Sequence, residues 1–155
     1  MNQEKKEAIS LKGHYKFTLR DIVTGKVRVI EVDNIIPTVG RTLLANNLTS
    51  ASPTNTPKIT HAALGSNTTV PANADTQLGT ETYRNAIASI TNSNNIAYAT
   101  AFYNATEVTG TFREAGIFCN GTGTANSGVL LSHVAVNITK SNTETLTIDF
   151  TLTIN

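Results

Sequence analysis

The final segment of the chain, from Thr145 to Ile154, alternates strictly between apolar and polar side chains. Leucine, isoleucine or phenylalanine occupies every second position, and threonine or aspartate occupies the positions between them. A period of two residues places all the apolar side chains on one face of a β-strand. Burial of these side chains contributes about 10 kcal/mol in total, at ~2 kcal/mol for each. The segment therefore predicts a core strand.

Similar segments occur throughout the chain. Residues 14–20 place Tyr15, Phe17 and Leu19 on one face, residues 26–33 are rich in valine, and Thr24-Gly25 between them suits a hairpin turn. Turn-forming residues separate the other expected strands. Short strands at this spacing predict an antiparallel sandwich or a barrel-like sheet, and we favour the sandwich. These further strands are expected at residues 59–64, 85–91, 96–103, 112–119 and 129–138.

One segment departs from the strand pattern. Leu43, Leu44 and Leu48 follow helical spacing, which predicts a short helix over Gly40 to Asn47. A chain of 155 residues is typical of one domain. We expect a charged N-terminal arm over residues 1–12, with Met1 to Leu11 contacting neighbouring subunits, and a single all-β antiparallel β-sandwich domain over residues 13–155.

The composition argues against several partners. The formal net charge is +1, and basic stripes with interleaved aromatic residues are absent, so we expect no nucleic acid. No apolar run approaches the ~18 residues of a membrane helix, and the first residues lack the apolar segment of a signal peptide. We therefore expect no membrane partner and synthesis in the cytoplasm.

A search for chemistry finds no catalytic, cofactor-binding or metal-binding constellation. The three histidines, His14, His61 and His133, lie in predicted strands without a neighbouring nucleophile motif. Cys119 is the only cysteine and ends an apolar strand, which favours a small buried group over a nucleophile. Asp33 and Asp75 lie beside asparagines and could bind Ca²⁺ weakly, but turn capping is the favoured interpretation. We therefore expect no enzyme, no cofactor and no metal.

The loop that follows Ala63-Leu64-Gly65 has the appearance of a phosphate-binding loop. It lacks the second glycine and the lysine that a P-loop needs, and it also lacks the glycine spacing of a dinucleotide fingerprint. Gly65 is better suited to letting the chain leave a strand through a turn. We therefore interpret the loop as a structural element and not as a phosphate-binding site.

Two segments of the chain resemble a known family. They are ITHAALGSNTTVPANADTQLGTETYR at residues 59–84 and TFREAGIFCNGTG at residues 111–123. Together with the expected helix, they are similar to the N-terminal, virion-attaching domain of phage tail-collar fibre proteins and of related small tail or neck proteins. The resemblance covers about residues 35–155. Its structural motif corresponds here to Gly65, Leu78, Glu81, Arg84, Arg113, Glu114, Gly116 and Phe118.

The resemblance implies a non-enzymatic virion protein of the tail, baseplate or neck, or a fibre-attachment subunit. Its expected partners are other virion proteins and copies of itself, in a symmetric homo-oligomer such as a trimer. The chain stops at Asn155 without a fibre shaft, so we expect a stand-alone subunit. A capsid decoration protein and a host-glycan-binding module that uses tyrosines and asparagines are the alternatives.

The motif also contains charges that lie beside apolar residues. We expect Arg84 to pair with Glu114, or Glu81 to pair with Arg113, because an unpaired charge in such a strand would be costly. Four solvated charges are the alternative interpretation.

Overall fold

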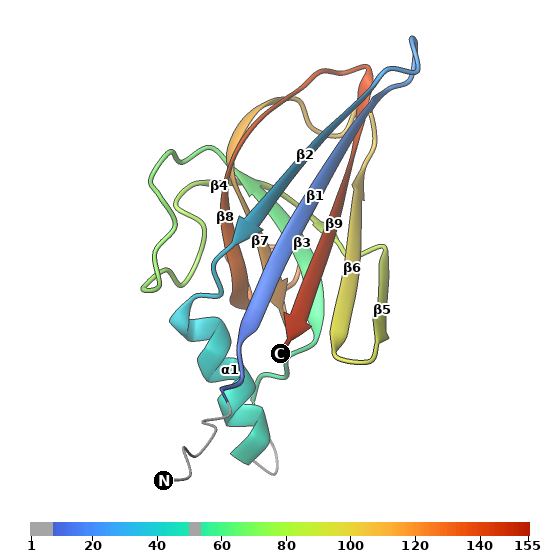
Figure 1. The fold of residues 1–155 in the computed structure, drawn as a ribbon. Helices are drawn as coiled ribbons and strands as arrows, with labels where there is room; N and C mark the ends of the chain where they lie inside the picture. Colours follow the sequence, from blue (N-terminus) through green and yellow to red (C-terminus); the bar gives the residue numbers. More distant parts are fainter. Residues whose placement is uncertain (1–7, 50–53) are drawn as a thin grey trace, which may run out of the picture.

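The computed structural model describes residues 8–49 and 54–155 and contains two antiparallel sheets. Sheet A has the strand order β2-β1-β9-β6-β5, and sheet B has the order β4-β3-β7-β8. The protein is therefore an all-β antiparallel sandwich (Figure 1). The strands of sheet A are β1 (Leu11–Asp21), β2 (Val27–Asn34), β5 (Ser89–Ser93), β6 (Ile96–Tyr103) and β9 (Glu144–Ile154); those of sheet B are β3 (Ile59–Gly65), β4 (Glu81–Ala86), β7 (Gly110–Cys119) and β8 (Val129–Lys140).

The main core lies between the two sheets and confirms the alternation patterns. Tyr15, Phe17 and Leu19 of β1 are fully buried, as are the apolar side chains of β9 from Leu146 onward, except for the half-exposed Ile154. β1 pairs along its whole length with β9 in an antiparallel register. The predicted Thr24-Gly25 turn lies in the hairpin that joins β1 to β2.

The predicted helix is confirmed and is longer than expected. α1 (Thr38–Thr49) packs against β8 and is the one helix among the described residues. Leu43 is buried, whereas Leu48 points into solvent although it shares the helical spacing. At 12 residues α1 is short, and no helix in the described ranges has both the length and the apolarity to cross a membrane.

Backbone pairing joins the two sheets beside α1. Just after β2, Ile35 exchanges two backbone hydrogen bonds of 3.1 Å with His133 of β8. The outer edge of β8 is therefore paired at His133 and covered by α1 nearby. This places His133 where sheet B, α1 and the end of β2 meet.

Two expected boundaries are wrong. Residues 85–91 were expected as one strand, but the chain crosses between the sheets there: β4 belongs to sheet B and β5 to sheet A. Residues 1–7 of the expected arm lie outside the described residues, but Leu11 already pairs with Ile154 in β1. The arm boundary at residue 12 is therefore too late.

Candidate functional site

Seven of the eight motif residues gather at the outer face of sheet B, the face turned away from sheet A. Two segments cover this face: residues 66–80, which we call the long loop, and residues 120–128, which we call the short loop. Arg113 is the exception, because its guanidinium donates to Asn137 at 2.7 Å instead. The motif is therefore a contiguous layer that attaches two loops to one sheet.

The apolar part of this layer is a small second core. Leu78 of the long loop packs with Phe118 and Leu130, and all three are essentially fully buried. Gly116 lies directly beneath Leu78: a Cβ atom there would be 2.9 Å from Leu78 Cδ2. A side chain at residue 116 would force Leu78 and Leu130 to shift, so the glycine lets these two side chains pack closely on the sheet.

Glu114 is the polar anchor of the long loop. Its carboxylate accepts backbone N–H bonds from Asn67 (3.3 Å), Gly79 (2.9 Å) and Thr80 (2.8 Å), and the residue is 1% exposed. A Cβ atom at Gly65 would lie 2.4 Å from Glu114 Oε1, so Gly65 leaves the space that this carboxylate fills. The Glu114 carboxylate therefore accepts the hydrogen bonds that backbone N–H groups at both ends of the loop would otherwise donate to water.

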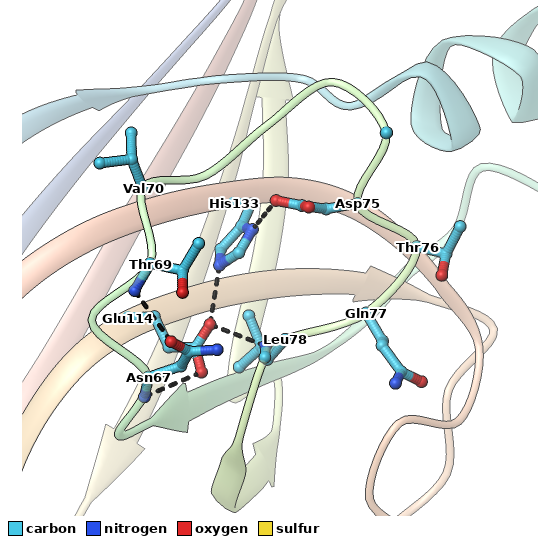
Figure 2. Close-up of a pocket in the computed structure, with 11 residues that line it drawn as sticks. Asn67, Thr69, Val70, Asp75, Thr76, Gln77, Leu78, Glu114 and His133 are labelled. Carbon is cyan, nitrogen blue, oxygen red and sulfur yellow. Dashed lines mark hydrogen bonds and ion pairs between the residues drawn. The ribbon is translucent and has the colours of Figure 1, made fainter.

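His133 extends this anchor to the middle of the long loop, as Figure 2 shows. Its Nε2 lies 2.9 Å from Glu114 Oε2, and its Nδ1 lies 2.8 Å from Asp75 Oδ2. Asp75 Oδ2 also accepts the backbone N–H of Ala72 at 2.7 Å. Asp75 is therefore a turn-capping residue, in agreement with the favoured interpretation, and it belongs to a chain of three ionisable side chains.

Arg84 fastens the short loop. Its guanidinium donates to the backbone carbonyls of Thr122 (3.1 Å) and Ser127 (3.0 Å), and it lies 4.5 Å above the ring of Phe118. It also forms a two-pronged pair with Glu81, at 2.5 Å and 2.7 Å. Their side chains are only 3% and 1% exposed.

The expected pairing of the four motif charges is wrong. Arg84 pairs with Glu81 within β4, while Glu114 faces His133 and backbone amides. The alternative of four solvated charges also fails, because Arg84, Glu81 and Glu114 are buried at their side chains. In a regular strand, side chains three residues apart point to opposite faces of the sheet. The register shift between Leu64 and Gly65 beside Glu81 changes the local alternation and accompanies this geometry.

Cys119 and His61 are two further residues with reactive side chains. Burial raises the pKa of the Cys119 thiol to about 12, so it stays protonated near neutral pH, and the expected burial of Cys119 is confirmed. Burial and the positive charge of Arg84 lower the pKa of His61, against the opposing effect of Glu81. Neither side chain is arranged as an activated nucleophile or its base.

Besides a small hollow of about 250 Å³ at Glu81, Arg84 and the short loop, two hollows border these elements. One, of about 290 Å³, lies between the long loop and the Glu114–His133 pair, and its charged groups are already bonded to one another. The other, of about 810 Å³, is a mostly apolar groove between α1 and the ends of β1 and β9. Within the described parts of the chain, no group of three acidic, histidine or cysteine side chains has the arrangement of a metal site.

Sequence reasoning missed two members of the layer, His133 and Asp75. His133 sits in VLLSHVAV, a nearly continuous apolar run in which one ionisable residue is unusual. Such a run indicates a strand buried on both faces, which would have required a partner for the histidine. Asp75, 58 residues away, carries no comparable signal because it resembles any turn aspartate.

No protein-family model matches the chain, and neither the curated proteins nor the solved structures compared with it gave a match.

Proposed function

We propose that the protein is a non-enzymatic structural subunit of a bacteriophage particle. Its place is the tail, baseplate or neck, or the attachment point of a fibre, and it acts there as a symmetric homo-oligomer, for which a trimer is one arrangement. It is made in the host cytoplasm and functions in the virion. The proposal starts from the resemblance of residues 59–84 and 111–123 to tail-fibre mounting domains.

The observation that carries the proposal is the use made of the motif residues. Glu114 and Arg84, together with the neighbouring His133, form hydrogen bonds to backbone groups and carboxylates of the protein itself. Their donors and acceptors fix loop conformation and present no reactive group to a substrate. A motif that fixes loops suits a subunit whose shape must be constant, because a rigid surface loses little entropy on assembly.

Two exposed surfaces are suited to contacts with neighbouring subunits. Val29 of β2 and Phe102 of β6 are about half exposed on the outer face of sheet A, in the same cross-strand row as Thr18 and Thr147. The apolar groove beside α1 is the second surface, and Leu48 and Ile9 at its rim are strongly exposed. Exposed apolar surface of this kind is typical of proteins that bind partners.

The test is the composition of purified particles. Virions are purified from a lysate of the phage that encodes the chain, and its peptides are quantified by mass spectrometry against the major capsid protein. We expect a small fixed copy number per particle, and imaging of particles labelled through a tag at Asn155 should place it on the tail or neck. A phage-encoded replication protein serves as the control for carry-over. Absence from virions contradicts the proposal.

The alternatives have different outcomes in the same experiment. Label spread over the whole head would assign the protein to capsid decoration. Tyr98 and Phe102 are exposed on β6, so a glycan array probed with the wild-type chain and with a Tyr98→Ser/Phe102→Ser variant tests the glycan-binding alternative. Binding that depends on these two aromatic side chains would replace a purely structural role by host recognition.

A further inference from the structure

We propose that one buried proton, held between His133 and Asp75, locks the long loop onto sheet B, and that loss of this proton releases the middle of the loop. The inference does not depend on the proposed function. It rests on a count of donors and acceptors along the Glu114–His133–Asp75 chain, shown in Figure 2.

Glu114 forms one end of this chain of ionisable side chains. Its two oxygens face four groups: the backbone N–H groups of Asn67, Gly79 and Thr80, and the Nε2 atom of His133. Three of these are donors by necessity. The fourth contact, between Oε2 and Nε2, needs one hydrogen, because two lone pairs would repel at this distance. We assign this hydrogen to Nε2 of His133 and leave Glu114 ionised, because a carboxylic acid is ordinarily a stronger acid than an imidazolium.

The other end of the chain gives the second hydrogen. Asp75 Oδ2 accepts the backbone N–H of Ala72 and also lies 2.8 Å from His133 Nδ1. This contact also needs one hydrogen, and the same order of acidity places it on Nδ1 and leaves Asp75 ionised. Both ring nitrogens then donate, and an imidazole with two N–H groups is an imidazolium. His133 is the cation between two carboxylates.

Among residues 8–49 and 54–155, no other charged side chain lies against the ring to take the place of this proton. Glu114 faces the ring from β7 and Asp75 faces it from the long loop, while the backbone of Ile35 pairs with it from the β2 side. Arg41 of α1 is bonded to Thr38 and lines the separate apolar groove. The remaining side chains around the hollow are uncharged; they are Asn67, Thr69, Val70, Ala74, Thr76, Gln77 and Leu78.

Loss of the proton affects the two ends of the chain differently. Nε2 keeps its hydrogen for Glu114, which is 1% exposed and cannot turn to water. Nδ1 then presents a lone pair to Asp75 Oδ2, and the two acceptors repel. The Asp75 side chain is 29% exposed, so it can swing out and take the Ala72 contact with it. The ends of the loop stay bonded to Glu114 while its middle opens.

The opening would also reach α1. The backbone N–H of Thr38, the first residue of the helix, donates to the carbonyl of Asn73 in the middle of the long loop at 2.9 Å. Release of Asp75 therefore frees the start of α1 and the wall of the apolar groove, of which Asn73 is part. The locked loop binds one more proton than the open loop, so its population falls as pH rises.

The test measures amide hydrogen exchange between about pH 6 and about pH 9, above the range in which carboxylates titrate. After correction for intrinsic exchange, protection at Thr38 and Ala72 should fall by up to about tenfold per pH unit for one linked proton. Protection at Gly79 and Thr80 should stay constant, because their bonds to Glu114 remain. A flat profile at Thr38 and Ala72 overturns the proposal.

Asp75→Asn is the diagnostic variant. Its amide can donate to the bare Nδ1 of a neutral ring, so the contact no longer needs the proton. We expect the pH slope at Thr38 to disappear while Thr38 stays protected at both ends of the range. Asp33→Asn, which alters the exposed pair with His14, is the matched control and should keep the wild-type slope. An unchanged slope in Asp75→Asn contradicts the lock, as does an unprotected Thr38 at every pH.

The protonation of His133 can also be measured in the wild-type chain, which tests the proposal even if Asp75→Asn does not fold. Nitrogen-15 spectra of the histidine ring distinguish an imidazolium from either neutral tautomer. We expect His133 to carry hydrogens on both ring nitrogens at neutral pH and on Nε2 alone at the alkaline end. A ring with a single N–H at neutral pH overturns the proposal.

Discussion

The two outer faces of the sandwich each carry a histidine–aspartate pair, and the comparison between them is instructive. His14 and Asp33 lie 2.8 Å apart on sheet A, and His133 and Asp75 lie 2.8 Å apart on sheet B. The first pair is 44% and 90% exposed at its side chains, the second 4% and 29%. The His–Asp distance is the same in the two pairs. The pairs therefore differ in their surroundings, because loops cover the pair on sheet B and exclude water from it.

The outer face of sheet A is exposed to solvent. Strands with alternating apolar and polar side chains predict such a face, because only their apolar side is buried. Lys16 stands between Glu31 and Asp149 in one cross-strand row, so opposite charges are neighbours in water. Sheet B has buried residues on both faces of β7 and β8. There the same residue types must be satisfied without water, and a lost partner costs the full desolvation of the group left behind.

The largest expected difference in stability between the two faces comes from replacing a glutamate on each of them. Glu114→Ala removes the acceptor of three loop amides and leaves the His133 cation beside an empty space, so it should lower the free energy of unfolding by about 3–5 kcal/mol. Glu31→Ala on the exposed face should change it by less than about 0.5 kcal/mol. Urea denaturation of both variants measures the difference, and equal midpoints would contradict the anchor role of Glu114.

Arginine gives the next contrast. Arg84→Met leaves the Glu81 carboxylate buried without its cation and removes the bonds that hold the short loop, so we expect a loss of about 3 kcal/mol. Arg20→Met, on the exposed face, is the control and should be nearly neutral.

A double variant separates the pair from the loop contacts. Adding Glu81→Gln to Arg84→Met neutralises the stranded carboxylate and should recover part of the stability. No recovery would indicate that the loop bonds of Arg84, and not its pairing with Glu81, account for its contribution. Thermal unfolding of the four proteins of this cycle measures the coupling.

The apolar contrast is smaller. Leu78→Ala empties the centre of the second core above Gly116, and we expect a cost of about 2–3 kcal/mol together with faster proteolysis within residues 66–80. Val29→Ala removes a side chain that is half exposed on sheet A and should cost less than about 0.5 kcal/mol. Similar costs for the two variants would show that the long loop is not fastened through Leu78.

How much the sequence could predict differs between the faces in the same way. The open face and the main core follow from period-two patterns, which is why Tyr15, Phe17 and the alternating residues of β9 were placed correctly. The covered face depends on which loop folds over which strand. That choice brings Asp75 to His133 across 58 residues, and no local pattern encodes it.

The wrong pairing of the motif charges has the same origin. The four charges were expected to be paired because an unpaired charge in a strand is costly, with four solvated charges as the alternative; the burial of Arg84 and Glu114 excludes that alternative. The partners were assigned by expecting the two motif segments to meet charge to charge. Instead, the end of the long loop turns back over β7, and its backbone N–H groups donate hydrogen bonds to the Glu114 carboxylate. Backbone groups carry no sequence signature, so this partner could not be read from residue types.

The smallest effect is expected at the exposed histidine–aspartate pair, where a null result is the prediction. Asp33→Asn removes the charge beside His14, but both side chains are solvated and water replaces the lost contact. The free energy of unfolding should change by less than about 0.5 kcal/mol, and added salt should remove even that difference by screening. A loss comparable to that of Glu114→Ala would mean that water is excluded from this face too, for instance by another copy of the chain. Repeating the measurement across protein concentrations decides this point, because only an intermolecular cover depends on concentration.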